Sequence, residues 1–314
     1  MASYPEQTAA LPASVRSREA LGYGACALAG TFWGTGFYFG KIALTELGVG
    51  HMVLYRFVFA CLGLLPVLRR PKLNRREWML LLTASFVGIP VQYLLQFYAL
   101  SLTTVSHAAL MVGTMPVILA IGATIFAHER LGWTGWLALA GSTCGVTLIS
   151  LSGTRAQSGH GGPSLEGDLL VVVSLTLSLV WILLNRHLML GQSPVVVTAW
   201  GVLSGTVMLA VWVMAVDGLP PVRGLSAQVW LASAAGGLLC TAASMLLWNW
   251  GIHRVPASRA GVFLNIEPAM GSILGVALLG DRLGAGAWAG GALIIAAAVV
   301  LTTTGKAEAE VVLE

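Results

Sequence analysis

Ten long apolar runs constrain the fold of this chain more than any other feature of its sequence. Clusters of charged or turn-forming residues separate the runs, and the 314 residues include only 17 Lys and Arg and 13 Asp and Glu. A bilayer core about 30 Å thick requires roughly 20 apolar residues in a helix. The runs are continuous rather than alternating, so they predict membrane-spanning helices and not strands. The predicted spans are 22–43, 51–68, 78–100, 105–127, 133–152, 167–187, 194–216, 227–250, 256–279 and 285–304.

The low charge content excludes a soluble protein of this size. Charged residues make up 10% of the chain, whereas an average soluble domain is about one quarter charged. The mean hydropathy is +0.83. The formal net charge of +4 does not indicate nucleic acid binding, because membrane proteins carry excess Lys and Arg for topological reasons. We therefore predict an all-α, polytopic membrane protein whose partners are the lipid bilayer and a small molecule, and not nucleic acid.

The distribution of positive charge predicts the orientation in the membrane. If the N-terminus is cytoplasmic, 12 of the 17 Lys and Arg residues fall in cytoplasmic segments, and the cluster between Arg69 and Arg76 dominates this bias. Cytoplasmic loops carry an excess of Lys and Arg. Both termini of this multi-pass chain are therefore expected in the cytoplasm of a bacterial-type cell, with the spans in its inner (plasma) membrane.

A repeat divides the sequence into two halves of five spans. The stretch 99–131 matches the stretch 251–283 at a constant shift of 152 positions, without a gap. The matched motifs are Ser106-His107-Ala108 with Ser258-Arg259-Ala260, Met115-Pro116 with Glu267-Pro268, Glu129-Arg130-Leu131 with Asp281-Arg282-Leu283, and Trp136 with Trp288.

Because five is an odd number of spans, the second half must be inverted relative to the first. Inverted repeats in membrane proteins are typical of alternating-access transporters. The predicted organisation is a ten-helix inverted 5+5 repeat with two tails and a Gly- and Ser-rich link. Its parts are a cytoplasmic tail at 1–21, a first repeat at 22–152, a periplasmic linker at 153–166, a second repeat at 167–304 and a cytoplasmic tail at 305–314.

These motifs resemble those of the EamA-type drug/metabolite transporter superfamily, and within it those of bacterial amino acid exporters, including the aromatic amino acid group. The resemblance covers about 22–304. It departs from the family pattern at Asp281, where Glu is usual, and at Trp181-Ile182, which stands in place of a Trp-Gly pair. The residues that carry it are Phe32-Trp33-Gly34, Gly40-Lys41, Tyr55-Arg56-Phe57, Tyr98-Ala99-Leu100, Ser106-His107-Ala108-Ala109, Pro116, Glu129-Arg130-Leu131, Trp181, Arg186, Glu267-Pro268 and Asp281-Arg282-Leu283.

The sequence offers no constellation typical of an enzyme. It contains no GxxxxGK[ST] phosphate-binding loop, no GxSxG nucleophile motif and no HExxH zinc motif. Its four cysteines lie singly in apolar runs, as small buried side chains do. We therefore expect no enzyme activity, no cofactor and no bound metal, and transport driven by a gradient.

Glu267 is the most informative ionisable residue. It lies about eight residues into its predicted span, or about 12 Å along the helix, and an ionisable group at that depth is a functional hypothesis by default. It falls opposite a stripe of small residues, on a face that we predict it shares with Phe263 and with Met111 of the first repeat. Glu267 either binds substrate or has a structural role, in which it caps backbone donors freed by Pro268 or pairs with an arginine, and the sequence leaves these roles open.

Other polar and aromatic residues within spans complete the predicted substrate site. Gln92 and Gln96 are one helical turn apart with Tyr93 beside them, and they either face a cavity or join two helices. In the family that the sequence resembles, this third span would be a cavity wall. Trp33 and Trp181 lie deep in their spans as approximate repeat mates, and Asn249 is a weaker candidate. The predicted substrate-binding residues are Trp33, Gln92, Tyr93, Gln96, Met111, Trp181, Asn249, Phe263 and Glu267.

The remaining charged residues in spans have structural interpretations. Lys41 and Arg56 are predicted near the outer ends of two helices, with Glu46 between them. We interpret them as snorkelling or ion-paired, and attraction of a substrate carboxylate at the outer mouth is the alternative. His107 is interpreted as a packing residue. The functional prediction is a secondary exporter of small metabolites that works by alternating access around a central cavity, with aromatic or other neutral amino acids as the first substrate class. Drugs, nucleosides or other metabolites are the alternative substrates, a scaffold or intramembrane enzyme is the distant alternative, and both monomer and homodimer stay open.

Overall fold

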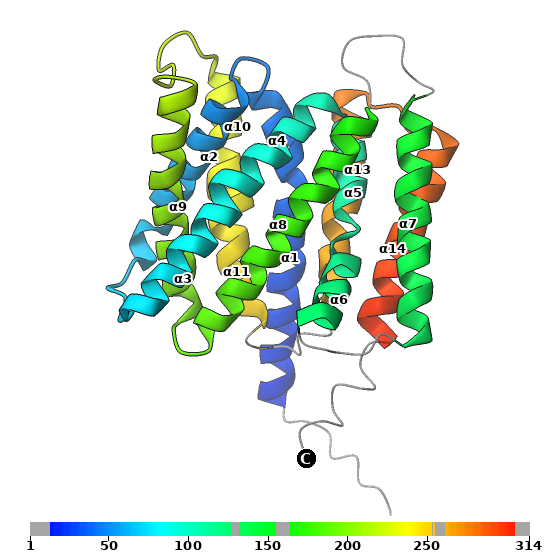
Figure 1. Cartoon of the computed structure of the whole chain (residues 1–314), viewed down its shortest axis with the longest axis horizontal. Coiled ribbons are helices and arrows are strands. Elements are labelled where there is room, and N and C mark those ends of the chain that lie inside the picture. Colours follow the sequence, from blue (N-terminus) through cyan, green and yellow to red (C-terminus); the bar gives the residue numbers. More distant parts are fainter. Residues whose placement is uncertain (1–12, 127–131, 155–163, 253, 255–260, 305–314) are drawn as a thin grey trace, which may run out of the picture.

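The computed structural model is a bundle of membrane-crossing helices (Figure 1). It describes residues 13–126, 132–154, 164–252, 254 and 261–304, and this part of the chain contains no strand. The elements of the first half are α1 (Ala13–Ala43), α2 (Val49–Leu64), η1 (Leu65–Val67), α3 (Arg75–Phe86), η2 (Val87–Val91), α4 (Gln92–Leu102), α5 (Val105–Val112), α6 (Met115–Phe126) and α7 (Trp133–Thr154). Those of the second half are α8 (Leu165–Met189), α9 (Pro194–Val216), α10 (Ala227–Gly237), η3 (Leu238–Ala243), α11 (Ser244–Ile252), η4 (Gly261–Asn265), α13 (Ile266–Leu279) and α14 (Ala285–Thr304).

The helices form the ten membrane-crossing segments that the apolar runs predict. Among the described residues, five segments are individually long and apolar enough to cross a bilayer. They are Val49–Val67, Arg75–Leu102, Leu165–Met189, Pro194–Val216 and Ala227–Gly251. The first helix begins at Ala13 rather than at residue 22. Hydropathy locates the part of a helix that lipid surrounds, and no proline lies between Ala13 and Ala43 to end the helix at the membrane surface.

Four crossing segments are interrupted, and the interruptions match between the halves. The third and eighth segments each contain a π-helical stretch, η2 and η3. In η2, Pro90 lacks an N–H and its ring crowds the preceding turn, which opens the hydrogen-bond ladder. The fourth segment breaks between α5 and α6, and the ninth changes from the 3₁₀ helix η4 to α13 at Asn265. The 152-residue shift places Val112, the end of α5, on Leu264.

The packing of the helices follows the same inverted symmetry. The segment α4 packs against α8, and its counterpart α11 packs against α1. Likewise α5 packs against α13 and α7 against α14. The last pair meets at glycines, because a Cβ on Gly145 would lie 2.6 Å from the carbonyl oxygen of Gly290 and one on Gly290 would lie 2.5 Å from that of Gly145. Two helices can approach this closely only where side chains are absent.

The beginning of α1 and the end of α14 lie at the same end of the bundle, toward which the α2–α3 connection also lies (Figure 1). Several predicted features fall outside the described residues. These are most of the tails, the linker over 155–163, Glu129-Arg130-Leu131 and Ser258-Arg259-Ala260.

Candidate functional site

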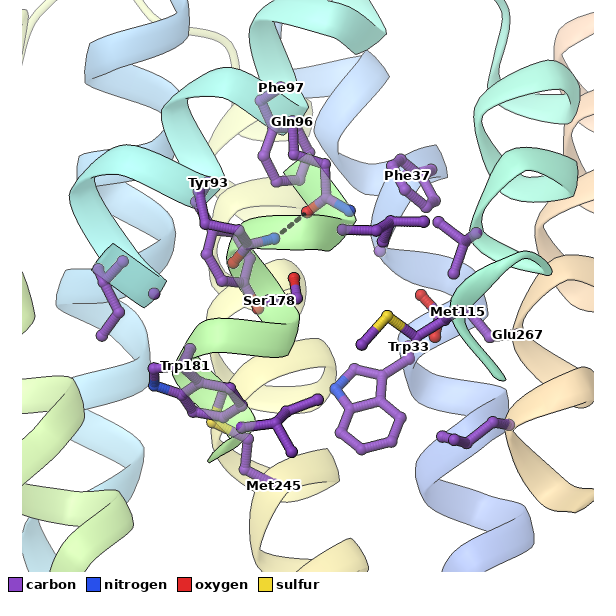
Figure 2. A pocket seen from close by; sticks show the side chains of 18 of the residues that line it. Trp33, Phe37, Tyr93, Gln96, Phe97, Met115, Ser178, Trp181, Met245 and Glu267 are labelled. Atoms are coloured by element: carbon purple, nitrogen blue, oxygen red, sulfur yellow. Dashed lines mark hydrogen bonds between the residues drawn. The ribbon is translucent and has the colours of Figure 1, made fainter. Parts of the chain in front are cut away.

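A cavity lies at the centre of the bundle, between elements of both halves (Figure 2). This central cavity has a volume of about 160 Å³, which is below the roughly 300–1,000 Å³ of sites for drug-sized ligands. Its wall is mainly apolar, with a small polar set from α2, α4, α8 and α13. The polar wall residues are Arg56, Gln92, Tyr93, Gln96, Ser178 and Glu267.

The structure brings six of the nine predicted site residues to this wall. The structure shows that these residues share one location, and their role in substrate binding stays a prediction. Figure 2 shows Trp33 of α1, Tyr93 and Gln96 of α4, and Trp181 of α8 around the same space, with Glu267 of α13 at its side. The six are Trp33, Gln92, Tyr93, Gln96, Trp181 and Glu267.

Three predicted site residues do not line the central cavity. Met111 is fully buried in the core, and Asn249 donates from Nδ2 to Thr198 Oγ1 at 2.7 Å. Phe263 packs against Tyr23, with ring centroids 5.8 Å apart. The predicted common face of Phe263, Met111 and Glu267 is therefore wrong. It assumed continuous α-helices, but the 3₁₀ geometry of η4 and the end of α5 at Val112 change the angle between successive side chains.

Arg56 is the main wall residue that sequence reasoning missed. Its side chain is buried, and its guanidinium carbon lies 5.3 Å from the ring centroid of Tyr93 and 5.2 Å from that of Phe97. Nε donates to Thr241 Oγ1 at 2.9 Å, and Nη2 donates to the carbonyl oxygen of Cys240 at 3.3 Å. Both acceptors belong to the π-helical stretch η3, so this irregular segment fixes the guanidinium against the cavity.

The predicted interpretation of Lys41, Glu46 and Arg56 as an outer charge group is also wrong. Lys41 Nζ donates to the carbonyl oxygens of Leu100 and Thr103, at 2.9 and 2.8 Å, at the end of α4. Glu46 accepts a hydrogen bond from the backbone N–H of Ser226 at 2.8 Å. This bond lowers the pKa of the exposed Glu46 carboxyl. The cost of an arginine within a span is the signal that could have identified Arg56 as a cavity residue.

Glu267 lies in the first turn of α13, just after the ninth segment changes from a 3₁₀ helix to an α-helix. Its backbone packs directly on α1, because a Cβ on Gly34 would lie 2.8 Å from the carbonyl oxygen of Glu267. Pro268, Ser272 and Gly275 of the predicted small-residue stripe are buried, and so is Gly271. Among the residues that the structure describes, none donates a hydrogen bond to the carboxylate or pairs with it. The carboxylate therefore lines the cavity with neither oxygen bonded to a donor among the described residues.

Gln92 and Gln96 form a pair along α4. Gln92 Nε2 donates to Gln96 Oε1 at 3.1 Å (Figure 2). This bond occupies one end of each amide, so one carbonyl and one amino group remain for a solute or water. Both side chains line the cavity, and among the described residues each bonds to the other rather than to another helix.

Aromatic and sulfur-containing side chains make up six of the other 13 wall residues. Trp33 lies 5.4 Å, centroid to centroid, from Trp248. Trp181 packs over Gly88, where a Cβ would collide with the indole. Met115, the repeat mate of Glu267, and Met245 lie beside them (Figure 2). Methionine and aromatic rings form an apolar surface that adapts to different solutes.

A second polar group lies outside the cavity, between α5 and α8. Asp168 is fully buried, and it accepts from Thr103 Oγ1 at 2.6 Å. Its other oxygen lies 3.0 Å from Nδ1 of His107. His107 is thus a satisfied interior histidine, and this group joins the first half to the second.

A ten-helix inverted repeat around a central cavity defines a multi-pass membrane protein of the transporter class. A sequence model described as the EamA-like transporter family matches residues 20–151 and again 165–303. The chain belongs to the EamA-like transporter family, which confirms the predicted resemblance.

Individual relatives have the same general character. The chain is 26% identical over 285 residues to an uncharacterized transporter of Archaeoglobus fulgidus, covering 88% of this chain and 95% of that protein. It is 23% identical over 250 residues to the uncharacterized transporter YetK of Bacillus subtilis, covering 76% and 74%. A solved crystal structure superposes with a TM-score of 0.62 at 18% identity, over 92% of this chain and 99% of the other, and shows the same fold.

Proposed function

We propose that this transporter is a secondary carrier of the inner membrane that exports small metabolites, with neutral amino acids, aromatic ones included, as its first substrate class. The observation that carries the proposal is the central cavity. A mainly apolar wall with a few polar groups suits a small solute that combines a polar head with an apolar body.

Transport is by alternating access, with residues 22–152 and 167–304 as the two moving units. In support, the cavity wall draws Arg56 from the first half and Glu267 from the second, so a bound solute contacts both units. The paired interruptions in the third, fourth, eighth and ninth segments also occur in discontinuous helices that line transporter sites. Because the sequence lacks a phosphate-binding loop, a solute or ion gradient drives the cycle, and the protein acts as a carrier rather than an enzyme.

Both termini lie in the cytoplasm. The bias of Lys and Arg supports this orientation, and so does the common end of the bundle shared by the start of α1 and the end of α14 (Figure 1). A reporter active only in the cytoplasm, fused after Glu314, should be active. Activity of a periplasm-specific reporter at the same position would contradict the orientation.

Counterflow in proteoliposomes tests the transport proposal. Purified protein is reconstituted into vesicles loaded with an unlabelled amino acid, and entry of the same labelled amino acid is followed, over a panel of amino acids, nucleosides and cationic drugs. We expect transient accumulation of labelled neutral amino acids. Accumulation of nucleosides or drugs alone would reassign the substrate class, and accumulation of no solute would contradict the transport function.

A further inference from the structure

Two opposite charges line the central cavity without pairing with each other. Arg56 of α2 and Glu267 of α13 both belong to its wall. The guanidinium and the carboxylate form no direct ion pair, since the ion pair found among the described residues is His107–Asp168. One charge comes from each half of the protein, and both side chains line the same cavity.

Each of these charges needs a partner that the described side chains do not supply. Moving an ion out of water costs several kcal/mol, which a well-placed opposite charge offsets. Glu267 has no hydrogen-bond donor among the described residues. Arg56 has neutral oxygens and two aromatic rings as its neighbours. A solute with one anionic and one cationic group would satisfy both residues and leave the occupied cavity electrically neutral.

Arg56 is suited to the anionic group. A guanidinium presents donors in a rigid fork that binds a carboxylate through two parallel hydrogen bonds. The hydrogen bonds from Nε and Nη2 to η3 fix the plane of that fork. Gly36 leaves room on the α1 side, because a Cβ there would lie 3.4 Å from Nη1.

Glu267 is suited to the cationic group. A carboxylate accepts from an ammonium at both oxygens, and this one is free to do so. Beside it, Trp33 and Met115 form an apolar part of the wall (Figure 2). An α-amino acid carries its carboxylate, ammonium and side chain on one carbon, so a single solute can address all three regions of the cavity.

We propose that the central cavity is a zwitterion site, in which Arg56 binds the carboxylate and Glu267 the ammonium of a neutral α-amino acid. The proposal rests on the proposed transport function and deepens it. Because the two charges belong to opposite halves, the substrate itself bridges the halves. A solute that lacks either charged group leaves one buried protein charge uncompensated and binds poorly.

Competition binding to the purified wild-type protein tests this without any variant. Labelled phenylalanine is displaced by unlabelled phenylalanine, by phenethylamine, which lacks the carboxylate, and by 3-phenylpropionate, which lacks the ammonium. Removing one partner of a buried charge pair costs roughly 30-fold or more in affinity. We expect both analogues to be at least about 30-fold weaker than phenylalanine. Displacement by either analogue within tenfold of phenylalanine would overturn the zwitterion site.

Two variants then assign the groups to the residues. In Arg56→Gln the preference for phenylalanine over phenethylamine should collapse, while the preference over 3-phenylpropionate persists. In Glu267→Gln the opposite pattern is expected. Matched controls are Arg254→Gln, whose arginine stacks on Trp250 at 3.6 Å outside the cavity, and Glu166→Gln in the exposed first turn of α8. Unchanged preferences in folded Arg56→Gln and Glu267→Gln would contradict the assignment.

The outcomes separate this inference from the transport proposal. If wild-type vesicles exchange nucleosides or drugs but no amino acid, or if the analogues bind as well as phenylalanine, the zwitterion site is wrong and the transport function stands. If wild-type vesicles exchange no solute of the panel, the transport function itself is wrong.

Discussion

His107 Nδ1 lies 3.0 Å from Asp168 Oδ2 in an interior pair that links the two halves of the protein. The side chains are 2% and 1% exposed, and Thr103 donates to the other oxygen of Asp168 at 2.6 Å. The buried carboxylate thus has partners for both oxygens, and α8 begins where α4 ends.

Removing the Asp168 carboxylate should destabilise the fold. Leaving a buried hydrogen-bonding group without its partner costs about 1–3 kcal/mol. Asp168→Ala removes the acceptor of Thr103 Oγ1 and the partner of His107 Nδ1, so it should lower the apparent melting temperature in detergent by several degrees. Glu166→Gln, at an exposed position on the same turn, is the control and should leave it unchanged. Equal melting curves for Asp168→Ala and the wild type would show that the pair does not hold the halves together.

A methyl group on Gly34 should move α13 away from α1. Its Cβ would lie 2.6 Å from Met270 Cβ and 2.8 Å from the carbonyl oxygen of Glu267. Overpacking of this kind costs about 1–3 kcal/mol. We expect Gly34→Ala to lower both thermal stability and counterflow. Gly24→Ala on the same helix, where nothing lies within 4 Å of the new Cβ, should leave both measurements unchanged. Equal behaviour of the two variants would contradict the close contact.

Acid should abolish one loop contact. The backbone N–H of Ser226 lowers the pKa of Glu46, so the stabilising bond is present above the ordinary Glu pKa of about 4.3 and is lost as the pH falls through the lowered value. Glu46→Gln should therefore differ from the wild type in melting temperature at pH 6, and the difference should shrink as the pH is lowered further and further below about 4.3. A difference that stays constant over this acid range would assign it to another cause.

Gln92 and Gln96 should matter more for transport than for folding. They bond to each other and face the central cavity, so alanine at either position leaves no interhelical bond broken among the described contacts. We expect Gln92→Ala and Gln96→Ala to reduce counterflow while expression and melting temperature stay near those of the wild type. A matched loss of stability in both variants would identify the pair as a structural contact.

The fold was predictable because lipid imposes a simple rule on sequence. Apolar runs must be about as long as the bilayer is thick, and they gave the ten segments and, with the 152-residue shift, their inversion. The interruptions were harder to predict. Pro90 marks η2, but the π-helical η3 contains no proline, and the break after Val112 depends on packing between distant segments.

The sequence was enough to predict site residues that stand out by their polarity. It was not enough where the prediction depended on the direction in which a side chain points around its helix. Glu267, Gln92 and Gln96 stand out because polar groups are costly in a membrane. Phe263 and Met111 were misplaced because a uniform helical rotation was carried through a 3₁₀ helix and a helix end. Arg56 was assigned to a helix end by its position in the span. Its burial against η3 depends on residues about 185 positions away, Thr241 among them.

Substrate protection of a single cysteine in the cavity wall tests whether the substrate binds in the central cavity. In a background without the four native cysteines, Ser178→Cys places a thiol on the wall, and Thr176→Cys places one on an exposed face of the same helix. The thiols are labelled with a membrane-permeant maleimide, with and without a neutral amino acid that the background protein exchanges. Because Ser178 lines the cavity, we expect the amino acid to slow labelling at position 178 and to leave labelling at position 176 unchanged. Equal labelling at position 178 with and without that amino acid would show that substrate binds elsewhere.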